Sequence, residues 1–257
     1  MDLGLEGKHA VVTGASKGIG LGVARALAAE GADVTMAART AEPLEAAAAA
    51  VRSDFGVKAT AVPVDLSESS DQVRLVDHLS HGPLDILINN AGAIPGGSIT
   101  DVDEETWRAA WDLKVFGYIN LTRSLLPRLE EQGHGVILNV IGAAADRPHP
   151  GYLAGAIGNS GLVAMSRALG STSLQRGVRV LAVNPGLIVT DRMGDILKQQ
   201  AEATWGDASR WEELIPTDPA PGTVEQCADV VAFLVSDRAS HVSGTVLTID
   251  GGASARS

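Results

Sequence analysis

Short runs of β-branched and other apolar residues alternate along almost the whole chain with longer stretches rich in alanine and leucine. The runs occupy residues 10–12, 34–37, 59–64, 86–88, 136–141, 178–183 and 246–249. Strands that are apolar throughout are typical of a sheet covered on both faces, and intervening helices favour right-handed parallel crossovers. The alternation therefore predicts an α/β fold: a single doubly wound parallel sheet with helices on both faces.

The length of 257 residues and the hydrophobic content of 45% suit one large core, so we expect a single domain over residues 1–257. One stretch, 190–222, looks irregular because it carries Trp205, Trp211 and three prolines. We interpret it as a lid over a binding site. Its indole rings are compatible with an apolar or cyclic substrate, but they are equally compatible with packing inside the lid.

The charge of the chain excludes several classes of partner. A formal net charge of −11 argues against nucleic acid, whose phosphates are bound by clustered lysine and arginine. Cys227 is the single cysteine, so no internal disulfide can form, and no Cys/His spacing indicates a metal site. No apolar run reaches membrane-spanning length and no leader pattern opens the chain. We therefore expect a cytoplasmic protein with no membrane partner and no metal.

A glycine-rich turn follows the first expected strand and precedes a helix. It reads Thr13-Gly14-Ala15-Ser16-Lys17-Gly18-Ile19-Gly20. Glycines at these spacings allow a tight turn, a close approach of backbone to a diphosphate, and close packing of the helix on the strand. A purely structural β-to-α turn also favours glycine, so the turn alone leaves that alternative open.

Further motifs give the chain a resemblance to a known family. The pattern Thr-Gly-x-x-x-Gly-Ile-Gly resembles that of the short-chain dehydrogenases/reductases, and three later motifs agree with it in order. These are Asn89-Asn90-Ala91-Gly92, Asn184-Pro185-Gly186 with Thr190, and Gly244 with Asp250-Gly251-Gly252. The resemblance covers nearly the whole chain. It implies a Rossmann-type sheet, a nicotinamide cofactor, a small-molecule substrate, and a homodimer or homotetramer.

The resemblance also implies which residues meet the cofactor. Asn90 and Gly92 would hold the central sheet near the cofactor, the segment from Pro185 to Thr190 would flank the nicotinamide, and Asp65 would meet the adenine. The full expected set is Gly14, Ser16, Lys17, Gly18, Ile19, Gly20, Arg39, Asp65, Leu66, Asn90, Ala91, Gly92, Pro185, Gly186, Ile188 and Thr190. Alternatively, Asp65 is a helix N-cap and the glycines are ordinary turns.

The end of the second strand favours NADP(H) as the cofactor. An acidic residue there would accept hydrogen bonds from a free ribose 2′-hydroxyl, whereas this chain has Ala38-Arg39. A guanidinium pairs with a 2′-phosphate, and Lys17 adds a second positive charge nearby. The alternative is that Arg39 only covers the following helix.

The catalytic positions depart from the family pattern. The position of the family's serine falls on Gly142, that of its tyrosine on Gly155, and that of its lysine on Asn159. Its helical asparagine aligns with Lys114, so lysine and asparagine are exchanged.

We therefore take Lys114, Tyr152 and Asn159 as the candidate catalytic residues. Tyr152 and Asn159 are seven residues apart and share a face if the helix begins early enough. Tyr152 would then be the proton donor, with the Lys114 ammonium lowering the pKa of its phenol. The alternative is structural: a solvated Lys114, a hydrogen-bonded Asn159, and a Tyr152 packed over the lid.

Other titratable residues have simpler interpretations. His149 lies near Asp146 and Arg147 in a loop, where we expect it to be solvated. The acidic run from Asp101 to Glu105 is typical of a helix start, and His78 and His81 of a helix end.

The sequence thus favours an NADP(H)-dependent oxidoreductase that moves hydride between nicotinamide and a carbonyl or secondary alcohol. Two alternatives stay open: an NADP(H)-binding sensor or scaffold without turnover, and a non-redox enzyme on the same fold.

Overall fold

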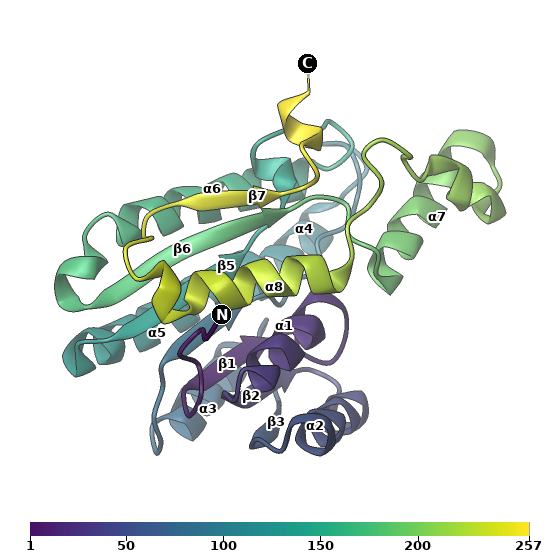
Figure 1. Ribbon diagram of the computed structural model, residues 1–257. Coiled ribbons are helices and arrows are strands. Elements are labelled where there is room, and N and C mark those ends of the chain that lie inside the picture. The colour runs from purple at the N-terminus through teal and green to yellow at the C-terminus, as the bar shows by residue number, and fades with distance from the viewer. Residues whose placement is uncertain (257) are drawn as a thin grey trace.

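The computed structural model describes residues 1–256, and its central element is a seven-stranded sheet (Figure 1). All seven expected strands form, most of them one or two residues longer or shorter than the apolar runs predicted. They are β1 (His9–Thr13), β2 (Asp33–Ala38), β3 (Ala59–Pro63), β4 (Ile86–Asn89), β5 (Gly135–Val140), β6 (Val178–Pro185) and β7 (Val246–Ile249). The predicted α/β fold class is confirmed.

Eight α-helices connect or follow these strands. They are α1 (Gly18–Ala29), α2 (Ala41–Phe55), α3 (Ser69–Leu79), α4 (Glu104–Trp111), α5 (Gly117–Gln132), α6 (Leu153–Gly170), α7 (Asp191–Trp205) and α8 (Val224–Val235). Asp103 caps α4 by accepting a hydrogen bond from the Thr106 N–H, and Glu104 and Glu105 lie in its first turn. The acidic run therefore marks a helix start, as expected.

The strands are all parallel and run in the order β3-β2-β1-β4-β5-β6-β7. The chain winds outward from β1 to β3, then returns to β4 and winds the other way. Ligands of such sheets bind where the winding reverses, at the carboxyl ends of the strands. Here that point lies between β1 and β4.

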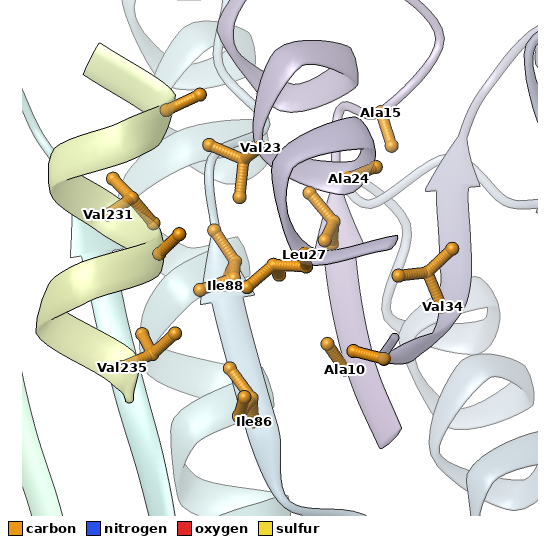
Figure 2. Close-up of a cluster of buried hydrophobic side chains, with 14 of the residues drawn as sticks. Ala10, Ala15, Val23, Ala24, Leu27, Val34, Ile86, Ile88, Val231 and Val235 are labelled. Atoms are coloured by element: carbon orange, nitrogen blue, oxygen red, sulfur yellow. The ribbon is translucent and has the colours of Figure 1, made fainter. Parts of the chain in front are cut away.

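Alternate residues of each strand enter two different cores. Ala10 and Val12 of β1 pack in the core beneath α1, α2 and α8, while Val11 between them packs in the core beneath α3 and α5. Figure 2 shows the first core, where Val23 and Leu27 of α1 meet Val231 and Val235 of α8 above strands β1, β2 and β4. This packing explains why the strands are apolar throughout.

A π-helical turn interrupts the long helix between β4 and β5. This turn, η1 (Asp112–Phe116), joins α4 to α5 without a break, and Lys114 lies at its centre. A π-turn adds one residue to a helical turn and re-aims the side chains within it, and such turns are frequent at functional sites. Lys114 consequently points into the protein and is only 8% exposed.

The prediction that the stretch 190–222 is irregular is wrong over its first half. Residues Asp191–Trp205 form α7, and a 3₁₀ segment, η4 (Ala208–Leu214), follows. Met193, Leu197 and Ala201, spaced four apart, are the buried face of α7. In Figure 1, α7 and the segment after it project away from the sheet. The two ends of the stretch lie together, since Val189 N–H donates to Gly222 O at 2.8 Å.

Membrane-spanning helices and clusters of possible metal ligands are both absent from the described residues. Among residues 1–256, no helix is both long and apolar enough to cross a membrane. Within the same range, no three His, Cys, Asp or Glu side chains gather in a way that would hold a metal ion. Cys227 is buried in α8, and burial raises the pKa of its thiol to about 11.

Candidate active site

The glycine turn lies at the carboxyl end of β1. The Gly14 N–H donates to Ala37 O of β2 at 2.7 Å, and Gly14 has a φ of +66°, which favours glycine. A Cβ on Gly20 would lie 2.3 Å from Gly14 O, so only glycine lets α1 begin this close to the strand. The turn thus directs the N–H groups at the start of α1 toward the switch point between β1 and β4.

Side-chain hydrogen bonds tie the ends of β1 and β4 together. The Thr13 hydroxyl accepts from the N–H groups of Asn90 and Ala91 at 2.8 and 3.0 Å. Asn90 Nδ2 donates back to Thr13 O at 2.9 Å. These bonds fix the loop after β4 against the glycine turn.

Arg39 and Asp65 face each other at the ends of β2 and β3. The Arg39 side chain is 78% exposed, and its Nη1 lies 4.0 Å from Asp65 Oδ2. Burial raises the pKa of the Asp65 carboxyl, but hydrogen bonds from Ser67 and the Arg39 charge outweigh it, so the net shift is downward. Asp65 is not a helix N-cap, because Glu68 precedes α3 and Asp65 instead closes a local turn with Ser67.

The sixteen residues expected to meet a cofactor all lie at or just beyond the carboxyl ends of five strands, on both sides of the switch point. Gly14, Ser16, Lys17, Gly18, Ile19 and Gly20 follow β1; Arg39 follows β2; Asp65 and Leu66 follow β3; Asn90, Ala91 and Gly92 follow β4; Pro185, Gly186, Ile188 and Thr190 end or follow β6. The sheet therefore brings them to one edge.

Three consecutive peptide carbonyls at the end of β5 each accept a hydrogen bond from a helix side chain. The Tyr118 hydroxyl donates to Val140 O at 2.9 Å, Lys114 Nζ to Ile141 O at 2.5 Å, and Asn159 Nδ2 to Gly142 O at 3.4 Å. Lys114 and Tyr118 come from one side, η1 and α5, and Asn159 comes from α6. Lys114 and Asn159 therefore converge on adjacent peptides, although they are 45 positions apart in the chain.

Lys114 is buried, which rules out the interpretation that it is a solvated helix residue. A Cβ on Gly92 would lie 3.0 Å from Lys114 Cδ, so the lysine stem passes under the loop after β4. Burial, with a smaller contribution from the nearby Arg192 charge, lowers the pKa of the ammonium to about 7. Lys114 can therefore hold or release a proton near neutral pH.

Asn159 and Gly142 form the other half of this cluster. Asn159 is 2% exposed and its Oδ1 has no hydrogen-bond partner among the described residues, so the interpretation of a fully satisfied asparagine is not supported. Gly142 has a φ of +136° and a ψ of +143°, a conformation that is essentially limited to glycine. The backbone conformation at this position therefore favours glycine over any residue that carries a side chain.

The ring of Tyr152 occupies the space in which a side chain at position 155 would begin. A Cβ on Gly155 would lie 1.9 Å from Cε1 and 2.3 Å from Cζ of Tyr152. Tyr152 immediately precedes α6, and its ring packs near Ile94 and Ala154. Tyr118 is the other of the chain's two tyrosines. It is buried beneath β5, and burial raises the pKa of its phenol. Of the two tyrosines, only Tyr152 is partly exposed, whereas the hydroxyl of Tyr118 is buried against Val140 O.

The cation beside Tyr152 is Arg192, a residue that no sequence motif indicated. Burial raises the pKa of the Tyr152 phenol, and the Arg192 guanidinium opposes that shift. Lys114 was expected to fill this role, but its ammonium bonds the peptide of Ile141 instead. Arg192 lies in the first turn of α7 and donates to Gly92 O and to Ile94 O, the latter at 2.9 Å. Arg192 was missed because its hydrogen-bond partners are backbone carbonyls, which every residue type carries and which therefore leave no pattern in the sequence.

A polar network fixes the loop that carries Gly142. The Asp146 carboxylate accepts from Asn184 Nδ2 at 2.7 Å and from the Thr248 hydroxyl at 2.9 Å. Asn184 Oδ1 in turn accepts from the Gly142 N–H at 3.4 Å. Asp146 therefore acts as a bridge from the loop to β6 and β7.

Comparison with known proteins identifies the family. The profile of the family described as "short chain dehydrogenase" matches residues 8–201. The chain belongs to the short-chain dehydrogenase family.

Several members of the family resemble this one along almost their full length. The granaticin polyketide synthase putative ketoacyl reductase 2 of Streptomyces violaceoruber is 38% identical over 261 residues, covering 96% of both chains. The structure of L-sorbose reductase from Gluconobacter frateurii, complexed with NADPH and L-sorbose, has a TM-score of 0.91 and 31% identity, covering 100% of both chains. A variant of actinorhodin polyketide ketoreductase with NADPH has a TM-score of 0.90 and 27% identity, covering 97% of this chain and 98% of that one. This chain is thus an oxidoreductase by family.

Proposed function

We propose that this protein is an NADP(H)-dependent reductase of a carbonyl compound that uses Lys114, Tyr152 and Asn159 in place of the usual catalytic set. The observation that carries the proposal is the convergence of Lys114 Nζ and Asn159 Nδ2 on the adjacent peptides of Ile141 and Gly142. The two side chains have exchanged helices, yet they still meet at the end of β5. The charge and the amide that the family pattern places there are both retained.

The residues at the strand ends fit a nicotinamide nucleotide with a 2′-phosphate. The first turn of α1 would hold the diphosphate through its N–H groups, because Gly14 and Gly20 keep backbone, not side chains, at that point. Arg39 and Lys17 are exposed and would pair with the 2′-phosphate. The complexes of sorbose reductase and actinorhodin ketoreductase with NADPH support the same choice.

The cofactor would supply the hydride, and the side chains would manage the proton. During reduction, the Tyr152 phenol would give its proton to the carbonyl oxygen, which gains negative charge as the carbonyl carbon is reduced. The ammonium of Lys114 stabilises the negative charge that develops on that oxygen, and Asn159 orients the peptides around it. Tyr152 then regains a proton from solvent, and the reverse steps oxidise an alcohol.

One test separates the chemical role of Lys114 from cofactor binding. We expect Lys114→Met to lower the turnover of carbonyl substrates by at least about 100-fold, in the range of lost general acid–base or electrostatic catalysis. The Kd for NADPH, measured by its fluorescence, should change less than about threefold, because Lys114 contacts the loop after β5 and not the glycine turn. Unchanged turnover in Lys114→Met would contradict the role.

An NADP(H)-binding protein without turnover is the second candidate. The glycine at 142 and the raised pKa of Tyr152 favour it, since both weaken the usual activation of a carbonyl. Saturable NADPH binding, with no oxidation of NADPH across a broad carbonyl panel, would favour this candidate over the reductase.

A further inference from the structure

Arg192 holds a positive charge at the reacting end of the site. Its guanidinium is half-buried, donates to the carbonyls of Gly92 and Ile94, and lies beside the phenol of Tyr152. Ile94 belongs to the small apolar cluster against which the Tyr152 ring packs. The guanidinium, Tyr152 and the loop after β4 are thus one contiguous group.

No acidic side chain balances this charge. Within residues 1–256, Arg192 and Lys114 form no ion pair at 4.0 Å or less, and the only charge that shifts the Lys114 pKa is that of Arg192. Most other arginines do pair with carboxylates, among them Arg25, Arg52, Arg74, Arg108, Arg176, Arg210 and Arg256. The chain has 31 acidic and 20 basic residues, so carboxylates are not scarce. Two neighbouring, partly desolvated cations without a counter-ion are costly, and an anion bound between them would remove that cost.

We propose that the substrate is an oxo acid, whose carboxylate binds Arg192 while its carbonyl group lies at Tyr152. The proposal rests on the reductase function proposed above and specifies its substrate class. The guanidinium has five N–H donors, and its bonds to Gly92 O and Ile94 O use two of them. Donors therefore remain for a carboxylate without loss of the bonds that fix the side chain. The planar fork of arginine matches both carboxylate oxygens.

The position of Arg192 sets the spacing within the substrate. Because the guanidinium lies beside the Tyr152 phenol, the carboxylate and the reacting carbonyl must lie close together in the substrate. A 2-oxo or 3-oxo acid meets this condition.

The cofactor diphosphate is the competing anion for Arg192. Thr190, two residues earlier, lies near the glycine turn, with its Cγ2 3.6 Å from a Cβ built on Gly18. Arg192 itself is hydrogen-bonded to residues 92 and 94 of the loop after β4 and lies beside Tyr152, and among the described residues its guanidinium makes no hydrogen bond to the glycine turn. The geometry therefore favours the substrate over the diphosphate.

The test compares acids with their methyl esters. With NADPH as reductant, we expect wild-type kcat/KM for short 2-oxo or 3-oxo acids to exceed that for the matched esters. Arg192→Gln should lower kcat/KM for the acids by about 10- to 150-fold, the loss of a charge-assisted hydrogen bond, mainly through KM. Its kcat/KM for the esters should fall by a clearly smaller factor, because the esters lose only the effect of Arg192 on the pKa of Tyr152, so the acid-to-ester ratio falls. Its Kd for NADPH should change less than about threefold. Arg210→Gln, which removes the same charge from the same 190–222 segment, is the control and should leave the acid-to-ester ratio unchanged.

Each contrary result has a distinct meaning. Equal losses on acid and ester, or a wild-type preference for esters, would overturn the carboxylate site. Weaker NADPH binding in Arg192→Gln with an unchanged acid-to-ester ratio would assign Arg192 to the diphosphate and also overturn the proposal. If wild type oxidises no NADPH with any carbonyl, the reductase function fails. Calorimetry with oxamate in the presence of NADP+ then decides the anion site separately: binding lost in Arg192→Gln supports it, and no binding to wild type refutes it.

Discussion

At the scale of single residues, the buried ammonium of Lys114 is the strongest departure from ordinary protein chemistry. A lysine that is 8% exposed and whose only nearby charge is another cation is destabilising while it is protonated. Active sites commonly retain groups that reduce stability, because the same groups perform the chemistry. We therefore expect one substitution, Lys114→Met, to raise the stability of the protein and to lower its turnover.

The stability effect of Lys114 depends on pH in a defined window. Its pKa falls from 10.5 in the unfolded chain to about 7 in the folded protein, so between these values the unfolded state binds the extra proton and stability rises with pH. A tenfold change in a proton-binding constant corresponds to about 1.4 kcal/mol. Lys114→Met should therefore be more stable than wild type by a few kcal/mol at and below pH 7, and the gain should shrink toward pH 10.5. Urea unfolding at several pH values measures it, and a pH-independent difference would contradict the burial of a charged Lys114.

At the scale of elements, the start of α6 determines where the phenol lies. The Tyr152 ring occupies the space above Gly155, and a methyl group there would collide with Cε1 at 1.9 Å. Gly155→Ala should therefore displace the ring and lower turnover by at least about tenfold, since small misplacements of catalytic groups have large effects on rate.

A control variant separates the effect of a displaced Tyr152 ring from the effect of a more stable helix. Ala replaces glycine inside a helix, so the substitution should stabilise α6 intrinsically by up to about 1 kcal/mol. Gly161→Ala, in the same helix with nothing within 4 Å of the added methyl group, should leave turnover unchanged. Full activity in Gly155→Ala would show that the packed position of Tyr152 is irrelevant to turnover.

The strands and the site residues differ in how much of them the sequence predicts. Each strand is a continuous apolar run because it is covered on both faces, so all seven were predictable. Helix α7 was not predicted, because the prolines and tryptophans of 190–222 mask the helical spacing of Met193, Leu197 and Ala201. The π-turn that directs Lys114 inward has no sequence signature. The hydrogen bonds of Arg192 to backbone carbonyls have no sequence signature either. The same holds for the positive φ of Gly142.

At the scale of the whole molecule, the net charge of −11 opposes the binding of any phosphate-rich cofactor. Local cations must therefore decide the choice between NADPH and NADH, and Arg39 is exposed at the end of β2 for that role. Arg39→Ala should weaken NADPH binding by about tenfold or more and leave NADH binding within about twofold. Added salt should reduce the wild-type preference for NADPH, because an exposed pair is screened. Equal losses for both cofactors in a titration would contradict the assignment of Arg39 to the 2′-phosphate.

The central claim for the molecule as a whole is that it reduces a carbonyl with hydride from NADPH while the rearranged side chains handle the proton. The direct measurement uses NADPH deuterated at C4 on its two faces in turn, incubated with a panel of oxo acids and neutral ketones, with product alcohols analysed by mass spectrometry. We predict deuterium in the product from one face only with wild type, and a deuterium yield at least about 100-fold lower with Lys114→Met at saturating NADPH. NADPH that binds but delivers no deuterium to any carbonyl would contradict the claim.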